Sequence, residues 1–281
     1  MVSFRKLFVR ANHALESAGL LNANELSVIF ELATGARFLE LTRPDDAAPE
    51  GASERLEVLL DRRIGGEPLQ YIAGTWPFLD FELKIGEGVL IPRPETELLA
   101  EKAIDFLQSR PRSDSLAALD LCSGSGCIAI AIARAVPSCT VAAAELSCDA
   151  MTFLKHNVSE LASGIDVIEA DVFELDQRLA DSSLDCITCN PPYLLACEYD
   201  DNPELEREPR EAFVGGADGL EFFRHIVLYY KRTLKSEGAL FFETGATQTE
   251  AVAELLRAGG YRDIEILRDV FGLLRVVKAL A

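Results

Sequence analysis

Residues 120–126, DLCSGSG, decide the fold class of this chain of 281 residues. The apolar run SLAALDLC (residues 115–122) leads into this stretch, and an alanine-rich segment, residues 128–135, follows it. The pattern predicts a strand, a tight turn and a helix. Gly124 and Gly126 suit the turn because glycine adopts backbone conformations closed to other residues and lets a ligand approach the main chain. The stretch therefore favours an α/β fold, in which the turn is either a ligand-binding loop or only a compact connection from strand to helix.

Further apolar runs alternate with helical stretches toward the C-terminus. They are TVAAAEL (140–146), DVIEAD (166–171), LDCITCN (184–190), GALFFET (238–244), IEILRDV (264–270) and LLRVVKAL (273–280). Strands separated by crossover helices form a parallel sheet that is covered on both faces. The last two runs have no helical stretch between them, so we expect them to pair in antiparallel fashion. The predicted fold class is α/β, with a Rossmann-like sheet.

The first third of the chain has a different pattern. Apolar residues recur at helical spacing, as in Leu56, Leu59, Leu60 and Ile64, and glycines mark helix ends. We predict a helical bundle over residues 1–73. Alternation at Phe81, Leu83 and Ile85 predicts a β-hairpin linker over residues 74–91, which leaves residues 92–281 for the sheet domain.

The charge of the chain argues against a nucleic-acid partner. It carries 27 basic and 46 acidic side chains, a formal net charge of −19. Residues 1–75 hold 8 basic and 11 acidic side chains, so the remaining 19 and 35 give residues 76–281 a charge of −16. Neutralising phosphates requires lysine and arginine, and here both are outnumbered.

Cysteine spacing and the N-terminus indicate the compartment. The seven cysteines are odd in number and do not form two CxxC motifs, which argues against a disulfide framework and against a zinc site. The first ten residues, MVSFRKLFVR, contain no continuous apolar region, and the longest apolar run, residues 127–133, ends at Arg134. We expect a cytoplasmic protein that binds no metal and no membrane.

An acidic residue follows the glycine turn at the sequence separation found in nucleoside-binding folds. Glu145 comes about 20 residues later, at the end of the next predicted strand, where nucleoside-binding folds place a carboxylate that accepts the ribose hydroxyls. The lysine of a GxxxxGK[ST] loop is missing, which disfavours ATP or GTP hydrolysis, and Ala129 stands at the third glycine position of a dinucleotide loop, which leaves NAD as a weak alternative. Asp171 is placed to accept from an adenine amine, and Phe173 to pack on the ring; a helix cap and a core residue are equal alternatives.

The tetrapeptide NPPY, residues 190–193, carries the most chemical information. Pro192 favours an extended Pro191, so the Asn190 side-chain oxygen and the Pro191 carbonyl can accept from the two protons of one planar NH2 group, which Tyr193 can cover. These bonds raise the electron density on a nitrogen whose lone pair is otherwise delocalised, and they fix its orientation. Beside a nucleoside pocket, the natural electrophile is the methyl group of S-adenosylmethionine. Orientation and a dry site then provide most of the acceleration.

With these motifs the chain resembles the release-factor glutamine methyltransferases of the HemK/PrmC family. The stretches that carry the resemblance are GVLIPRPETELL (88–99), the glycine turn, NPPY, and EPREAFVGGADGLEFFRHI (208–226). The resemblance implies a Rossmann-like S-adenosylmethionine-dependent methyltransferase domain behind a helical bundle that recognises the substrate. It also implies methyl transfer to the side-chain amide nitrogen, N5, of the glutamine in the GGQ loop of peptide-chain release factors.

The resemblance also implies roles for residues. The segment from Cys122 to Gly126, Glu145 and Val172 would bind the cofactor, and Asn190 would touch both cofactor and glutamine. Pro191, Pro192 and Tyr193 would complete the glutamine pocket. The family commonly has glycine at Cys122 and aspartate at Glu145, and some members have an aromatic residue at Val172. The expected set is therefore catalytic Asn190, Pro191, Pro192 and Tyr193, and cofactor-binding Cys122, Ser123, Gly124, Ser125, Gly126, Glu145, Asp171, Val172 and Asn190.

Two other functions remain as alternatives. Nucleic-acid amino-methyltransferases of the adenine-N6 type also carry NPPY-like turns, but the acidic catalytic part lacks a basic recognition region. A cofactor-binding partner protein without turnover would not need an intact NPPY turn. We expect release factors as partners, no direct contact with nucleic acid, and a monomer.

Overall fold

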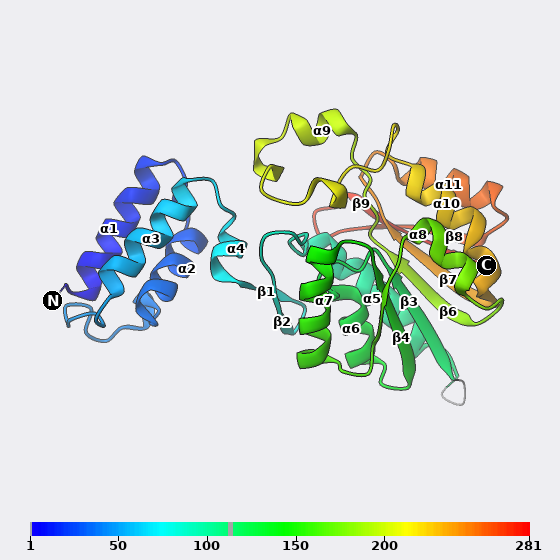
Figure 1. Cartoon of the computed structure of the whole chain (residues 1–281), viewed down its shortest axis with the longest axis horizontal. Helices are drawn as coiled ribbons and strands as arrows, with labels where there is room; N and C mark the ends of the chain where they lie inside the picture. The colour runs from blue at the N-terminus through cyan, green and yellow to red at the C-terminus, as the bar shows by residue number, and fades with distance from the viewer. Residues whose placement is uncertain (1, 112–114) are drawn as a thin grey trace. The chain divides into compact units, whose positions relative to one another are not determined.

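The computed structural model describes residues 2–111 and 115–281 (Figure 1). The chain divides into two compact units, residues 1–76 and 77–281. The boundary lies inside the first strand of the hairpin. Each unit is built around its own buried core.

The N-terminal unit consists of short helices. They are α1 (Phe4–Ser17), α2 (Ala23–Thr34), the 3-10 turn η1 (Phe38–Glu40), α3 (Ala52–Ile64) and α4 (Leu69–Ala73). Asn22 caps α2 by accepting from the backbone N–H of Glu25, which satisfies one of the donors left free at a helix start. The apolar faces meet around Phe30, which is fully buried. The predicted helical bundle is confirmed.

The hairpin is shorter than the predicted range 74–91. Its strands are β1 (Thr75–Phe78) and β2 (Phe81–Lys84), and Phe81 and Leu83 are buried as their alternation predicts. Residues 85–93 leave regular structure because Gly86 and Gly88 form a turn in which Val89 N–H donates to the Gly86 carbonyl. The second strand is tied to the C-terminal unit by Asn157, whose side chain accepts from Lys84 N–H and donates to the Lys84 carbonyl.

A seven-stranded sheet forms the centre of the C-terminal unit. Its strands are β3 (Leu116–Leu121), β4 (Cys139–Glu145), β5 (Asp166–Glu169), β6 (Leu184–Cys189), β7 (Leu234–Glu243), β8 (Arg262–Arg268) and β9 (Leu274–Leu280). The order is β5-β4-β3-β6-β7-β9-β8, and all neighbours are parallel except β9, which runs antiparallel to β7 and β8. The predicted parallel sheet and its antiparallel C-terminal pair are confirmed.

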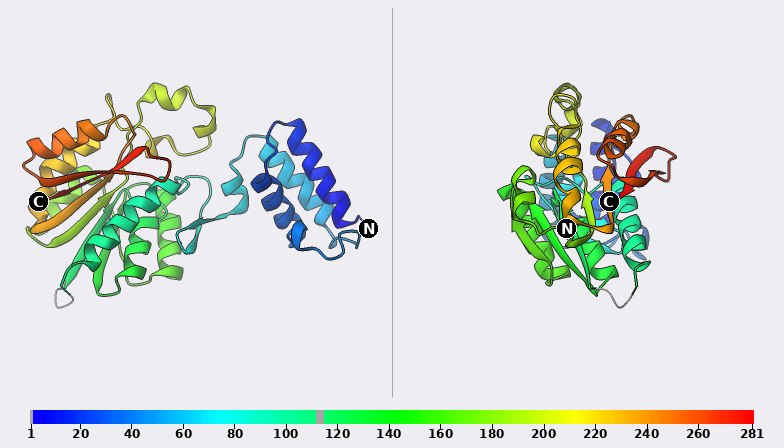
Figure 2. Two further views of the ribbon diagram at one scale, coloured as in Figure 1. Left: turned by 180° about the vertical axis from the view of Figure 1, so that it is seen from behind. Right: turned by 90° about the vertical axis from the view of Figure 1, so that its right-hand side faces the viewer.

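Helices cover both faces of this sheet (Figures 1 and 2). The main ones are α5 (Pro94–Gln108), α6 (Cys127–Ala135), α7 (Cys148–Leu161), α8 (Val172–Leu175), α10 (Glu221–Tyr229) and α11 (Thr249–Ala258). Adjacent side chains of β7 show the two layers, because successive strand residues point to opposite faces. Phe241 meets Phe106 of α5 at 5.9 Å between ring centroids, and Phe242 meets Phe223 of α10 at 5.1 Å.

The sheet order places a crevice beside β3. The chain leaves β3 toward β4 on one side, and β6 pairs with the other edge of β3. In open α/β sheets, ligands bind at such a reversal, outside the carboxyl ends of the strands. The glycine turn follows β3, Glu145 ends β4 and NPPY follows β6, so all three lie at that edge. In the described part of the chain, no helix has the length and apolar character needed to cross a membrane.

Candidate active site

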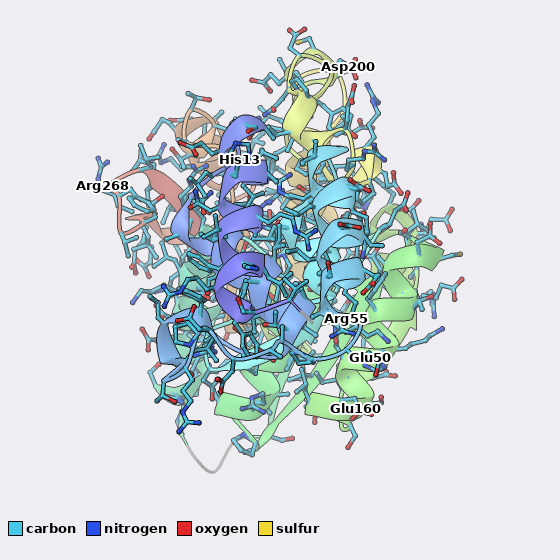
Figure 3. All side chains as sticks on the ribbon, turned by 90° about the vertical axis from the view of Figure 1, so that its left-hand side faces the viewer. His13, Glu50, Arg55, Glu160, Asp200 and Arg268 are labelled. Carbon is cyan, nitrogen blue, oxygen red and sulfur yellow. The ribbon has the colours of Figure 1, made fainter. Side chains whose placement is uncertain are left out.

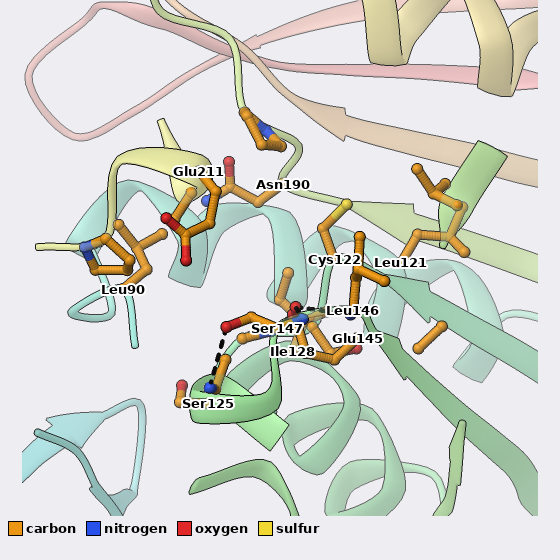
Figure 4. Close-up of a pocket in the computed structure, with 18 of the residues that line it drawn as sticks. Leu90, Leu121, Cys122, Ser125, Ile128, Glu145, Leu146, Ser147, Asn190 and Glu211 are labelled. Carbon is orange, nitrogen blue, oxygen red and sulfur yellow. Dashed lines mark hydrogen bonds between the residues drawn. The ribbon is translucent and has the colours of Figure 1, made fainter. Parts of the chain in front are cut away.

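A cavity of about 290 Å³ opens at the carboxyl ends of β3, β4 and β6 (Figure 4). The sequence-predicted residues that line it are Cys122, Ser123, Gly124, Ser125, Glu145, Asp171, Val172, Asn190 and Pro192. Three further predicted residues, Gly126, Pro191 and Tyr193, are chain neighbours of lining residues but are not part of its wall. The structure thus brings together the three motifs that the sequence places at separate strand ends.

The glycine turn has the backbone that the sequence predicts. Gly124 and Gly126 have positive φ angles of 55° and 86°, and Cys122, a residue with a side chain, has 55°. A Cβ on Gly126 would lie 2.7 Å from Cδ1 of Leu154, so this glycine permits close packing of α6 on α7. Gly124 has open space instead, and it is needed for its backbone angle alone. The left-handed angle at Cys122 explains physically why glycine suits that position.

Asp120, in β3, holds the glycine turn in place through hydrogen bonds. Its side chain is fully buried and accepts hydrogen bonds from the hydroxyl groups of Ser123 (2.8 Å) and Thr188 (2.8 Å). Burial raises the pKa of this carboxyl group to about 7, because desolvation disfavours the charged form, against the lowering by these two hydroxyl donors. The turn is therefore held between β3 and β6.

The carboxylate of Glu145 accepts hydrogen bonds from the protein's own backbone. Oε2 accepts from Gly124 N–H at 2.7 Å, and Oε1 accepts from the N–H groups of Leu146 and Ser147 at 2.8 Å each. A carboxylate offers about four acceptor sites, so three are occupied and one on Oε2 is left for a ligand hydroxyl. Contact with both hydroxyls of a ribose, the prediction from sequence, requires one of these backbone bonds to be exchanged.

The loop after β5 forms the next part of the wall. Asp171 caps α8 by accepting from Phe173 N–H at 2.9 Å and lines the cavity as well, so one side chain has both of the positions that the sequence offers as alternatives. Val172 is buried, and its carbonyl accepts from the hydroxyl of Tyr230 at 2.7 Å. Phe173 packs on Phe222, at 4.9 Å between centroids. Both phenylalanines also line the cavity, so this part of the wall is apolar and aromatic.

The NPPY turn is held by the segment that follows it. A Cβ on Gly215 would lie 2.3 Å from the Pro192 carbonyl oxygen, and one on Gly219 would lie 2.4 Å from the Tyr193 carbonyl oxygen. Gln248 donates its side-chain N–H to that same Tyr193 oxygen at 2.8 Å. The GGADG segment therefore contacts the turn so closely that only glycine fits at these two positions.

Two oxygens of the turn have no partner in the described part of the chain. Asn190 donates through Nδ2 to the Thr96 hydroxyl at 3.3 Å, while its Oδ1 accepts no hydrogen bond there. The Pro191 carbonyl, between the lining residues Asn190 and Pro192, likewise accepts none among residues 2–111 and 115–281. Asn190 is partly exposed and Pro191 is buried, and two unpaired acceptors on adjacent residues are suited to a ligand with two donors. Burial raises the pKa of the neighbouring Tyr193, so its ring stays neutral.

An ion pair between Arg93 and Glu208 lies at the edge of the cavity. Glu208 is buried, accepts from Ile91 N–H at 3.0 Å and pairs with Arg93, whose guanidinium also lies over the Phe213 ring at 5.9 Å. Glu208 lies between α9 (Ala196–Asp200) with η3 (Pro203–Leu205) on one side and η4 (Arg210–Ala212) on the other. It therefore fastens this segment to the residues before α5.

The remaining acidic side chains of the segment differ from Glu208. Asp200 lies at the outer surface of α9 (Figure 3), and Glu211 points into the same cavity as Asn190 (Figure 4). From the sequence, the acidic residues between Glu198 and Glu211 form either a substrate-facing rim or a solvated loop, and neither interpretation distinguishes Glu208 from Glu211. A buried glutamate in an acidic segment has no sequence signal of its own.

The cavity fits a nucleoside cofactor with a polar and an apolar part. Glu145 and Asp171 supply acceptors from the ends of β4 and β5. Ile128, Val172 and Phe173 supply apolar wall, and Leu146, 58% exposed, lines the same cavity. Small-molecule sites are typically such concave, mostly apolar cavities with a few placed polar groups. The residues therefore suit S-adenosylmethionine, the cofactor that the sequence implies.

Comparison with known proteins agrees with the fold. Residues 97–202 match the family described as "Methyltransferase small domain", and residues 6–74 match the "PrmC N-terminal domain". A curated relative, the release factor glutamine methyltransferase of Thermodesulfovibrio yellowstonii, is 36% identical over 234 residues, which cover 82% of this chain and 83% of the relative. That of Corynebacterium glutamicum is 37% identical over 241 residues, 84% of this chain and 83% of the relative.

A solved structure shows the same fold. The crystal structure of a methyltransferase from Pyrococcus furiosus superposes with a TM-score of 0.52 at 14% sequence identity, covering 82% of this chain and 98% of that one. At this identity the likeness concerns the fold alone.

Proposed function

Because this chain belongs to the family of release factor glutamine methyltransferases, we propose that it methylates N5 of the glutamine in the GGQ motif of peptide-chain release factors. It is an S-adenosylmethionine-dependent protein-glutamine methyltransferase. The observation that carries the finer proposal is the pair of free acceptors, Asn190 Oδ1 and the Pro191 carbonyl, beside the nucleoside cavity. A primary amide offers two N–H donors on one planar nitrogen, which matches that pair.

The chemistry follows from what these residues do to an amide. S-adenosylmethionine, when bound, supplies an electrophilic methyl group on a sulfonium. Asn190 Oδ1 and the Pro191 carbonyl would each accept one hydrogen bond from the glutamine NH2 group, which fixes the orientation of the nitrogen and raises its electron density. As the N–C bond forms, the C–S bond of the sulfonium breaks, and the methylated nitrogen gives up one of its two protons. Tyr193 covers the planar amide and excludes water. Orientation by fixed dipoles in a dry site is worth more than in solvent, because no reorganisation is needed at the moment of reaction.

Cofactor binding is assigned to the turn and the wall beside it. We propose that the turn from Cys122 to Gly126, the free acceptor site of Glu145, and Asp171 with Val172 hold S-adenosylmethionine. Asp171 and Val172 face its adenine. These residues come from the ends of β3, β4 and β5, so the sheet fixes their spacing.

Replacing Glu145 with glutamine should weaken cofactor binding. An amide NH2 group cannot accept from the backbone N–H groups that Glu145 now holds, and a hydrogen bond to a charged group is worth roughly 1.5–3 kcal/mol, so affinity should fall about 10- to 100-fold. Calorimetric titration with S-adenosylhomocysteine measures this. Glu169→Gln is the control, because Glu169 is the exposed register partner of Glu145 on β5 and removes the same charge. Equal affinities of the two variants would remove Glu145 from the cofactor site.

The partner and its recognition are also proposals. We propose that the helical bundle, residues 1–73, recognises the release factor, and that the protein acts as a monomer in the cytoplasm without contacting nucleic acid or a membrane. The bundle carries only three more acidic than basic residues, which favours recognition by shape over charge. The catalytic part, with its charge of −16, favours a protein substrate over a nucleic acid.

A methyl-transfer assay tests the proposal. The protein is incubated with methyl-labelled S-adenosylmethionine and, in separate reactions, a release factor, the same factor with GGQ glutamine replaced by alanine, and DNA or RNA. Label only on the unaltered factor, mapped by mass spectrometry to the glutamine N5 nitrogen, is the expected result. Label on nucleic acid would instead establish the amino-methyltransferase alternative, and label on both forms of the factor would contradict the proposed glutamine.

A further inference from the structure

A buried chain of hydrogen bonds leads from the NPPY turn into the core. Asn190 Nδ2 donates to the Thr96 hydroxyl at 3.3 Å, and that hydroxyl donates to Glu243 Oε2 at 2.6 Å. Thr96 and Glu243 are each 2% exposed. Thr96 lies in the first turn of α5 and Glu243 is the last residue of β7, so three separate elements meet at this chain.

The single proton of the Thr96 hydroxyl determines the orientation of the Asn190 side-chain amide. A threonine hydroxyl has one proton, and Thr96 gives it to Glu243. The hydroxyl oxygen can then only accept from Asn190, so it selects Nδ2 and not Oδ1 as the atom that faces it. Oδ1 is consequently left without a partner in the described residues, where a substrate amide needs an acceptor.

We propose that Thr96 and Glu243 are positioning residues that hold the Asn190 amide in the orientation that presents Oδ1 to the substrate. This inference rests on the proposed function of Asn190. A side-chain amide can rotate by 180° with little steric change, because its oxygen and nitrogen are nearly the same size. Without a partner that distinguishes them, Asn190 would spend part of its time presenting N–H donors to the substrate NH2 group, which itself offers only donors.

The protonation state of Glu243 determines which groups donate and which accept along this row of hydrogen bonds. Burial raises the pKa of Glu243 to about 7, because desolvation disfavours the carboxylate, and the Thr96 hydroxyl opposes this. Above this pH the carboxylate accepts from Thr96 and the orientation is held. Below it, protonated Glu243 can donate to Thr96, whose own proton is then free to bond Asn190 Oδ1 and turn Nδ2 toward the substrate. We therefore expect kcat to fall as the pH drops through about 7.

Other charged groups face Glu243 from the surrounding elements. Glu95 in α5 raises its pKa further, while Arg93 before α5 and Arg275 in β9 lower it. Burial, with Glu243 as a smaller cause, raises the pKa of Tyr193 in the NPPY turn and of Cys127 in α6, so both stay neutral near pH 7. Arg275 is also paired with Glu95 at 3.6 Å and with Asp269 at 3.4 Å, so its charge is shared. Charges of both signs thus surround Glu243, whose pKa of about 7 lies near neutrality.

Substitutions along the chain separate positioning from simple packing. Thr96→Val keeps the shape but removes the hydroxyl, and we expect kcat at pH 8 to fall about tenfold, with affinity for S-adenosylhomocysteine changed less than about twofold. Thr96→Ser restores the hydroxyl and should recover kcat to within about twofold of the original.

Glu243→Gln should abolish the change of kcat near pH 7. Asp120 has a pKa in the same range but contacts the glycine turn, so its titration should appear in cofactor affinity and persist in Glu243→Gln.

A second readout does not depend on turnover. In protein labelled with 15N-asparagine, the side-chain NH2 resonances of Asn190, identified from their loss in Asn190→Ala, should shift with a midpoint near pH 7 and lose this dependence in Thr96→Val and Glu243→Gln. Resonances of Asn190 that ignore pH in the unaltered protein, or a Thr96→Val enzyme as fast as Thr96→Ser, would overturn the inference. If the protein methylates no glutamine, the proposed function fails, but the resonances still test the orientation of Asn190.

Discussion

Replacing Asn190 with alanine is expected to lower turnover by roughly 10²- to 10³-fold, the usual cost of deleting one preorganised dipole at the reacting centre. The alanine removes the Oδ1 acceptor and leaves only the Pro191 carbonyl to orient the glutamine amide. Affinity for the cofactor should change far less, because the glycine turn, Glu145 and the loop after β5 provide most of the cavity wall. Single-turnover methyl transfer to a release factor measures the effect.

An exposed asparagine provides the control for this variant. Asn202 caps η3 and is exposed, so Asn202→Ala removes the same amide outside the cavity and should leave turnover unchanged. Turnover of Asn190→Ala within about threefold of the Asn202→Ala value, with the protein folded, would exclude Asn190 as the acceptor for the reacting amide.

Adding one methyl group at Gly215 is expected to reduce turnover by about 10²-fold, because displacements near 1 Å at a reacting centre can have such an effect. A Cβ at this position would lie 2.3 Å from the Pro192 carbonyl oxygen and 2.8 Å from Cα of Tyr193, and both are backbone atoms that cannot rotate away. The NPPY turn must therefore move. Steady-state methyl transfer with Gly215→Ala measures the loss, and retained affinity for S-adenosylhomocysteine would place it in the glutamine pocket.

A matched glycine tests whether the effect is local. A Cβ on Gly164, in the turn before β5, would have nothing within 4 Å, so Gly164→Ala should retain full activity. A Gly215→Ala enzyme as active as Gly164→Ala would mean that the position of NPPY is not critical for the reaction.

The fold could be predicted from the sequence because local pattern and burial agree. The run LDCITC of β6 is buried at every position, as expected for a central parallel strand that is covered on both faces. The chain crosses over between parallel strands through α6 and α7, and the only strands without a helix between them, β8 and β9 in the described sheet, are the antiparallel pair. The motifs mark strand ends, and strand order then brings them together.

The rest of the site depends on contacts between residues distant in the chain. Thr96 and Glu243 are 147 positions apart, and Glu243 ends an apolar run in which a glutamate signals only the end of a strand. Glu208 is joined to Ile91 across 117 positions. Local pattern assigns Glu145 a ligand role, but only the structure shows that it first accepts three backbone N–H groups. Packing decides which carboxylates bind a ligand and which bond to the backbone.

The orientation of the glutamine amide tests the central claim most directly. A crystal structure with S-adenosylhomocysteine and a peptide containing the GGQ sequence should show the glutamine nitrogen within hydrogen-bond distance of both Asn190 Oδ1 and the Pro191 carbonyl oxygen, and facing the sulfur atom. If these two oxygens instead bond to the protein's own backbone, with the glutamine held elsewhere, the account of catalysis given for the NPPY turn is wrong.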